Sequence, residues 1–231
     1  RDQPRSRGLG DVYKRQNEKF AKVNVRTKVV LPEGADPAKY SVETSVWNPN
    51  KQKLTAVRTS LAQMKYNNNQ AEQEFVIQAP SLWSPEMPAL YSAETRLYEG
   101  DKLKDIYTTP FGIRSIEIIP DKGFFLNGKR TVFKGVCNHH DLGPLGAAVN
   151  DAAIRRQIRI LKDMGCNAIR TSHNMPAPEL IRACDEMGMM IMAESFDEWN
   201  VAKCKNGYNL LFDEWAEKDL SLIHISEPTR P

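Results

Sequence analysis

Hydrophobic and polar residues alternate with a period of two along the first part of the chain. Over residues 23–29, three valines and a threonine alternate with Asn24, Arg26 and Lys28, as in a strand with one buried face. The same alternation predicts strands at 40–47, 54–60, 72–77, 91–98 and 106–111. Short strands separated by turn-rich stretches are typical of an antiparallel β-sandwich, which we expect over residues 17–113.

The pattern changes after residue 113. Asn127-Gly128 lies between the apolar runs 124–126 and 130–133 and predicts a β-hairpin. Continuous apolar strands are expected up to residue 137, at 168–171 and at 189–193, with amphipathic helices over 151–164 and 178–187 between them. This alternation indicates a parallel sheet covered by helices, either a doubly wound sheet or part of a (β/α)8 barrel.

Polar side chains follow each of the three expected parallel strands, in the clusters 138–141, 170–174 and 194–200. The carboxyl ends of parallel strands lie on one face of a sheet, where ligands bind. Histidine, asparagine, arginine and carboxylate side chains can make several hydrogen bonds to hydroxyl groups, and Trp199 can stack on the apolar face of a sugar. The clusters together predict a site for a polyhydroxylated ligand.

The first two clusters leave alternatives open. His139 and His140 are adjacent and point in opposite directions on an extended strand, so only one can face the site, and we expect it to be His139. Arg170 either contacts the ligand or holds a neighbouring carboxylate such as Glu194. His173 lies at the tip of its strand, where packing gives little reason for it, which favours a functional role.

Asn174, next to His173, is interpreted in the same way. The acidic residues of 194–198 fit either a functional role for Asp197 or the solvated first turn of a helix. The mixed run 213–219 is expected to be the first turn of a third outer helix, with no function of its own.

Composition excludes several classes of protein. Of the 231 residues, 41% are hydrophobic and 26% are charged, as in ordinary globular proteins. No apolar run approaches the roughly 18 to 20 residues of a membrane-spanning helix, so no membrane partner is expected. The four cysteines are widely spaced, which argues against a disulfide scaffold or a structural zinc site. We expect no cofactor and no metal ligand in this chain, and a divalent cation elsewhere in the protein stays open.

The two ends of the chain differ from the rest. Residues 1–16 have five Lys or Arg, two Asp and no apolar periodicity. One DNA sequence that encodes residues 11–16 has a reverse complement that encodes residues 220–225. Such a relationship between the two ends fits a library adapter that flanks a cloned piece of DNA in inverted orientation. We therefore expect 1–16 to be adapter-like and disordered and 220–231 to be an adapter-like tail, with a disordered basic arm as the alternative for the start.

The net charge of +3 comes from these ends. Residues 17–219 hold 26 basic and 26 acidic side chains, so the charge gives no indication of a nucleic-acid partner, and none is expected.

Several motifs resemble glycoside hydrolase family 2, the family of β-galactosidases, β-glucuronidases and β-mannosidases. Residues 82–91 and 111–114 are similar to the end of its immunoglobulin-like domain. The resemblance to the opening of its catalytic barrel is carried by residues 127–129, 134–141, 170–174 and 196–199. It covers about 17–219 and is closest to the β-galactosidase-like branch. It implies an immunoglobulin-like β-sandwich at 17–113, followed at 114–219 by about three strands of a TIM barrel.

The resemblance also implies an activity. Family members are retaining β-glycosidases that use one glutamate as acid/base and another as nucleophile, about 5 Å apart. Both belong to later barrel strands, so we expect no catalytic residue in this chain and no activity of the chain alone. Within it, the resemblance assigns substrate binding to His139, His173, Asn174, Asp197 and Glu194, with a carbohydrate as the partner.

One departure and two alternatives accompany this interpretation. Relatives usually have Asp-Glu where this chain has Ala193-Glu194, so the support of an aspartate is missing or moved. A metal-dependent barrel hydrolase would use His139 or His140, His173 and Asp197 as ligands, although two ligands from one strand would favour His-x-His. A non-catalytic carbohydrate-binding relative would keep the sugar site alone.

Overall fold

The computed structural model describes residues 5–7, 16–17, 19–63 and 70–226. The chain forms two compact units. Among the described residues, the first unit runs to Leu82 and continues through Ala89–Ser115, and the second comprises Trp83–Pro88 and residues 116–226.

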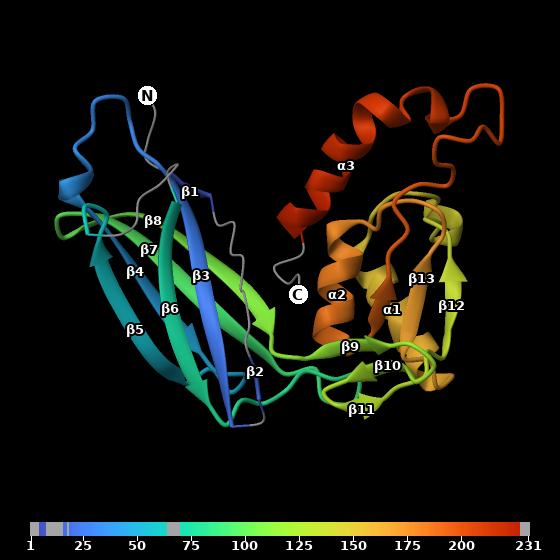
Figure 1. The fold of residues 1–231 in the computed structure, drawn as a ribbon, viewed down its shortest axis with the longest axis horizontal. Helices are drawn as coiled ribbons and strands as arrows, with labels where there is room; N and C mark the ends of the chain where they lie inside the picture. Colours follow the sequence, from blue (N-terminus) through green and yellow to red (C-terminus); the bar gives the residue numbers. More distant parts are fainter. Residues whose placement is uncertain (1–4, 8–15, 18, 64–69, 227–231) are drawn as a thin grey trace. The chain divides into compact units, whose positions relative to one another are not determined.

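The first unit is an antiparallel β-sandwich, as predicted, with two sheets face to face (Figure 1). One sheet contains β1 (Arg5–Arg7), β2 (Gln16–Asn17), β3 (Phe20–Val30) and β6 (Gln70–Gln78), with β3 paired to the other three. The other has the order β5–β4–β7–β8, with β4 (Tyr40–Trp47), β5 (Lys53–Ser60), β7 (Leu90–Glu99) and β8 (Lys102–Gly112). A single turn of 3-10 helix, Pro37–Lys39, precedes β4.

The core of the sandwich follows from the alternation in the sequence. In β3 the side chains of Ala21, Val23 and Val25 are almost completely buried, whereas those between them are half-buried. They pack in one cluster with residues from β6, β4 and β7 and with Phe111 of β8, whose ring stacks on Tyr91 at 5.5 Å between centroids. Burial of one face of each sheet therefore explains the period of two.

The adapter-like ends fall partly outside the described residues. Of the start, Arg5–Arg7 pairs antiparallel with β3 and Gln16 begins β2, while 1–4 and 8–15 lie outside them. Of the tail, the described part continues the last helix, and 227–231 lie outside.

The second unit begins with a small antiparallel sheet of order β11–β10–β9. The predicted hairpin is present as β10 (Gly123–Leu126) and β11 (Lys129–Arg130). Its turn residues Asn127 and Gly128 have φ values of 51° and 74°, the left-handed conformation that this pair adopts readily. The third strand, β9 (Ile116–Ile119), was not predicted, and β11 is shorter than the expected run to residue 133.

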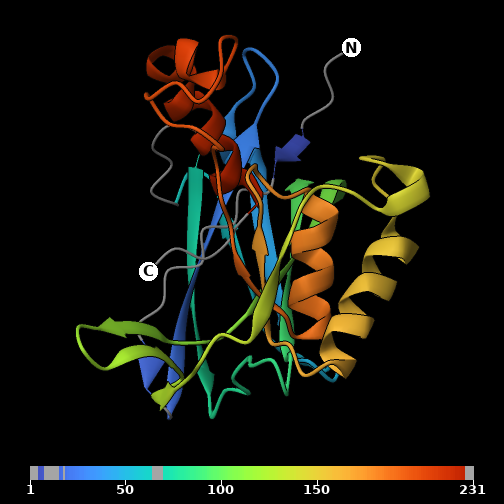
Figure 2. The same ribbon diagram turned by 90° about the vertical axis from the view of Figure 1, so that its right-hand side faces the viewer.

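The predicted parallel sheet follows, with order β12–β13–β14. Its strands are β12 (Gly135–Asn138), β13 (Ala168–Thr171) and β14 (Met190–Met192). The helices α1 (Asp151–Asp163) and α2 (Pro178–Met187) lie side by side on one face of this sheet (Figures 1 and 2). The chain continues through 3-10 turns at Gly143–Leu145 and Tyr208–Leu210 to α3 (Phe212–Ser226).

The helices begin and end where their sequence predicts. Asn150 caps α1, its side-chain oxygen accepting from the amide of Ala153 at 3.0 Å. Ile154 and Ile158 of α1 pack with Cys184 of α2 and with strand residues in one buried cluster. Among the described residues, no helix is long and apolar enough to cross a membrane.

At two glycines of this unit, the main chain lies so close to a main-chain carbonyl of another segment that no side chain fits. A Cβ on Gly135 would lie 2.1 Å from the carbonyl oxygen of Ala168, so β12 and β13 can adopt this pairing only with glycine there. Gly188, with φ of 75°, ends α2, and a Cβ there would lie 2.4 Å from the carbonyl oxygen of Pro85.

The segment Trp83–Pro88 packs on the second unit, although its motif resembles the end of the immunoglobulin-like domain. Trp83 is 1% exposed, and its indole N–H donates to the carbonyl of Asp185 at 2.8 Å. The ammonium group of Lys162 donates to the carbonyl of Pro85 at 2.9 Å. These bonds hold the segment against α1 and α2.

Candidate functional site

The three predicted polar clusters come together at the carboxyl ends of the parallel strands. His139 follows β12, His173 follows β13, and Glu194 follows β14. The rings of His139 and His173 meet edge to face, with centroids 5.2 Å apart and an interplanar angle of 82°. Parallel pairing of adjacent strands places these segments side by side, as the sequence predicted.

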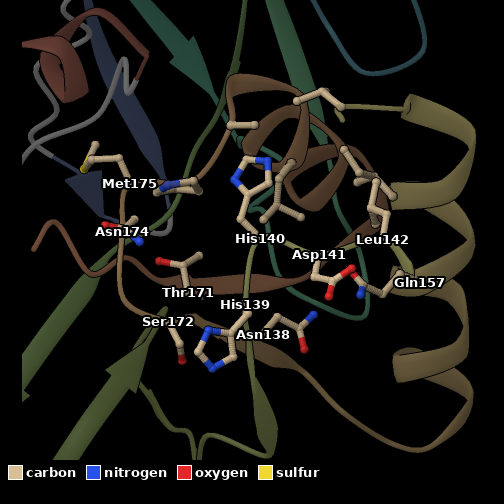
Figure 3. A pocket seen from close by; sticks show the side chains of 15 residues that line it. Asn138, His139, His140, Asp141, Leu142, Gln157, Thr171, Ser172, Asn174 and Met175 are labelled. Carbon is tan, nitrogen blue, oxygen red and sulfur yellow. The ribbon is translucent and has the colours of Figure 1, made fainter. Parts of the chain in front are cut away.

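The adjacent histidines point in opposite directions. Figure 3 shows the ring of His139 beside Ser172 and the ring of His140 on the other side of the strand. His139 is therefore the one whose ring meets that of His173.

Glu194 shares its carboxylate between two partners. Its Oε1 accepts from Nε of Arg170 at 3.0 Å and from the adjacent Nη2, and its Oε2 lies 3.0 Å from Nδ1 of His173. Desolvation alone would raise the pKa of Glu194, but hydrogen bonds from Arg170 and His173 outweigh it and lower that pKa. The alternative in which Arg170 holds this carboxylate is the one found, and Arg170 also donates to the sulfur of Cys137.

Asp197 lies near the same ring nitrogen of His173 as Glu194 does. Its Oδ1 is 4.0 Å from the Nδ1 of His173 and 3.0 Å from the ammonium nitrogen of Lys203, which also donates to the main-chain carbonyl of Asp197. The hydrogen bond from Lys203 lowers the pKa of Asp197. Half of the Asp197 side chain is exposed, so it remains open to a ligand.

Glu198 has a structural position, and the alternative of a solvated helix start at 194–198 is not the one found. No helix begins there, and Glu198 is only 4% exposed. Its carboxylate accepts from the amides of Lys203 at 2.6 Å and Asn209 at 3.3 Å. Because these amides need an acceptor in the loop before α3, the carboxylate turns inward and organises that loop.

Trp199 is exposed at the rim of an aromatic cluster. Its side chain is 61% exposed, while its ring contacts Phe196 and Phe212 with centroids 5.8 Å away in both cases. Phe196 in turn stacks on Tyr208 at 5.0 Å. These contacts hold one part of the indole, while most of its surface stays exposed.

Two pockets border the site. An open pocket of about 810 Å³ is lined by Asn174, Asp197, Phe196 and Tyr208, among others. A smaller one of about 50 Å³, shown in Figure 3, lies between the strand ends and the two helices. Asn174 lines both, His139 lines the smaller one and Asp197 the larger one, whereas His173 and Glu194 line neither.

The geometry does not assemble the ligands of the metal-dependent alternative. Over the part of the chain that the structure describes, no group of three or more His, Cys, Asp and Glu side chains could hold a metal ion. In Figure 3 the rings of His139 and His140 lie on opposite sides of the strand, so the two do not face one ion together. The four cysteines are free, and Cys184 is buried in the core.

Sequence reasoning missed two residues of the site. Lys203, in an irregular loop, pairs with Asp197. Thr171 accepts a hydrogen bond from the amide of Glu194 at 3.0 Å through its hydroxyl. Thr171 belongs to the second polar cluster and could have been found there, but nothing periodic marks Lys203.

Comparison with known proteins gives the family. The model for glycosyl hydrolases family 2 matches residues 11–114, and the model for the TIM barrel domain of the same family matches residues 117–227. The chain belongs to glycoside hydrolase family 2. Among relatives, it is 47% identical over 159 residues to beta-galactosidase BoGH2A of Bacteroides ovatus, covering 69% of this chain and 19% of that protein. It is 40% identical over 156 residues to a putative beta-glucuronidase of Formosa agariphila, covering 68% of this chain and 15% of that protein.

Solved family 2 structures confirm the fold. A family 2 member from Bacteroides cellulosilyticus superposes with a TM-score of 0.85 and 32% identity, over 99% of this chain and 30% of that one. A beta-glycosidase from Bacteroides vulgatus superposes with a TM-score of 0.83 and 33% identity, over 99% of this chain and 29% of that one. The chain is therefore a sandwich followed by the start of the family 2 barrel, and it spans less than a third of each of these relatives.

Proposed function

We propose that the protein containing this chain is a retaining β-glycosidase and that His139, His173, Asn174 and Asp197 hold the hydroxyl groups of its sugar. The observation that carries the proposal is the convergence of these side chains at the carboxyl ends of adjacent strands in a family 2 barrel. Exposed Trp199 adds a surface on which the apolar face of a sugar can stack.

The reaction needs two further carboxyl groups. In the retaining mechanism, an acid protonates the glycosidic oxygen as a carboxylate nucleophile attacks the anomeric carbon, and the leaving alcohol departs. Water, deprotonated by the first residue, then breaks the glycosyl ester and regenerates both groups. We assign those two carboxyl groups to barrel strands beyond this chain, so the residues described here bind and orient the sugar, and the chain alone is expected to be inactive.

We propose a neutral sugar, with a β-galactoside as the substrate, in preference to a glucuronide. Two observations support this choice. The two cations of the site, Arg170 and Lys203, are each paired with a carboxylate, Glu194 and Asp197. A uronate would have to compete with these carboxylates. The relative named a beta-galactosidase also has the higher identity of the two compared.

The test compares the complete gene product with the 231-residue chain on aryl β-galactosides and aryl β-glucuronides. We expect turnover of the galactoside by the complete protein and none by the chain. In the complete protein, His173→Ala should lower kcat/KM by at least about tenfold, the equivalent of about 1.4 kcal/mol of transition-state stabilisation. Glu186→Gln, on α2 in an ion pair with Arg155 and in neither pocket, is the control and should stay near wild type.

Other outcomes would contradict the proposal. Preference for the glucuronide would overturn the choice of sugar, and turnover by the chain alone would overturn the placement of the two carboxyl groups. Covalent labelling of the complete protein by a fluorinated galactoside distinguishes a retaining enzyme from the metal-dependent alternative. Sugar binding without turnover by the complete protein would favour a non-catalytic relative.

A further inference from the structure

The Glu194 carboxylate is fully engaged by protein groups. Its Oε1 accepts from two nitrogens of Arg170 and its Oε2 faces the Nδ1 of His173, while its own amide donates to the hydroxyl of Thr171. The side chain is 28% exposed. Arg170 donates twice to Oε1 alone, which leaves Oε2 as the oxygen that faces His173.

This arrangement determines which nitrogen of His173 carries a proton. Nδ1 lies 3.0 Å from Oε2 of Glu194 and 4.0 Å from Oδ1 of Asp197. Ionised carboxylates only accept hydrogen bonds, so the nitrogen that faces them must donate. A neutral imidazole has one N–H, and with that proton on Nδ1, Nε2 is an acceptor.

The remaining charged and titratable groups around His173 do not oppose this. Arg170, from β13, is held by Glu194, and Lys203, from the loop before α3, is held by Asp197. His139, after β12, presents its ring edge to face rather than a charged partner at hydrogen-bond distance. Each of the two carboxylates on the Nδ1 side is therefore held by a cation from another part of the chain, Arg170 on β13 or Lys203 in the loop before α3.

We propose that Glu194 is a positioning residue that holds His173 in the Nδ1–H tautomer, so that Nε2 of His173 accepts a hydrogen bond from a sugar hydroxyl. The second half of this inference rests on the proposed function, whereas the first half does not. It also assigns Glu194, expected from sequence to bind substrate, an indirect role through His173.

The tautomer can be measured directly in the 231-residue chain. Two-bond nitrogen–proton correlation spectra of 15N-labelled protein distinguish the two neutral tautomers of each histidine, and His173→Gln assigns the signal. Above the titration of the histidines, wild-type His173 should be predominantly Nδ1–H. A predominantly Nε2–H tautomer in the wild type would overturn the inference.

Glu194→Gln tests the cause. A glutamine at this position should turn its oxygen to the two donors of Arg170 and its NH₂ to Nδ1, which then accepts, so the major tautomer should change to Nε2–H. Glu186→Gln is the matched control, since Glu186 is also paired with an arginine, Arg155, but on α2 away from the site. An unchanged tautomer in folded Glu194→Gln would overturn the inference, and if that variant does not fold, the wild-type spectrum decides.

Galactose provides the second readout. Its addition should shift the Nε2 signal of wild-type His173 and leave that of Glu194→Gln less affected, because Nε2–H can no longer accept. An Nδ1–H tautomer without any response to galactose would overturn the sugar subsite, and with it this part of the proposed function, while supporting the action of Glu194 on His173. The two failures are therefore distinguishable.

Discussion

Trp83 and Asp185 lie 102 positions apart in the sequence and are joined by a hydrogen bond of 2.8 Å from the indole nitrogen to the main-chain carbonyl. The indole is 1% exposed, so the bond is made away from solvent. It ties the short segment Trp83–Pro88 to the last turn of α2, the helix that follows the strand carrying Arg170. The stability of the site-bearing unit therefore depends on residues far from the site.

Trp83→Phe should destabilise the second unit. It removes a buried hydrogen-bond donor and part of a large side chain, at a cost of about 1–3 kcal/mol in the free energy of unfolding. Trp215→Phe, at a tryptophan that is 42% exposed, is the control and should change stability by less than about 0.5 kcal/mol. Urea unfolding followed by circular dichroism measures both, and equal losses would contradict a special role of Trp83.

Gly135→Ala should disrupt the pairing of β12 with β13. The new methyl group would lie 2.1 Å from the carbonyl oxygen of Ala168, a main-chain atom that cannot move without breaking the ladder. We expect a loss of more than about 2 kcal/mol. Gly128→Ala, where a Cβ meets nothing within 4 Å and the strain comes from the positive φ of 74°, should cost about 1 kcal/mol. The melting temperatures of the two variants test this order.

Glu198→Gln should loosen the loop before α3 without unfolding the protein. Its NH₂ group would replace one of the two oxygens that accept from the amides of Lys203 and Asn209. Amide hydrogen exchange at these two positions should become at least several-fold faster. Glu214→Gln, at an exposed position on α3, is the control. Unchanged exchange at both amides would show that Glu198 does not organise the loop.

As the pH is lowered, the Glu194→Gln variant should lose less stability than the wild type. Hydrogen bonds to Arg170 and His173 hold the pKa of Glu194 in the folded protein below its ordinary value of 4.5, so the stability that this carboxylate contributes is complete above about pH 4.5 and is lost as the pH falls through the folded pKa. The variant lacks this contribution throughout, and the difference between its stability and that of the wild type should therefore shrink below pH 4.5. Urea midpoints between pH 3 and pH 7 measure it, and a constant difference would contradict the prediction.

Elements that bury one face were predictable from the sequence. Alternating burial in β3 and the apolar face of α1 leave a period that is visible in the residues themselves. β9 leaves none, because Ile116 and Ile118 are 46% and 80% exposed and no burial imposes a pattern there.

The site was predictable to the extent that strand ends define it. Arg170 and Glu194 are 24 positions apart, but they lie at the ends of adjacent parallel strands, and this was enough to name their contact as one of two alternatives for Arg170. Lys203 and the buried position of Glu198 depend on the path of an irregular loop, for which neither period nor turn signal exists. The packing of Trp83 depends on a contact with a distant helix that no local pattern specifies.

The order of strands in the second unit bears on how the protein is made. β12 pairs with β13 and β13 with β14, so each parallel strand lies beside the one synthesised just before it. A nascent chain leaving the ribosome can add each strand and helix to an edge that already exists, and the loops to be closed stay short. In the first unit β4 pairs with β7 only after β5 and β6 have been made. Vectorial synthesis therefore suits the sheet that carries the histidines better than it suits the sandwich before it.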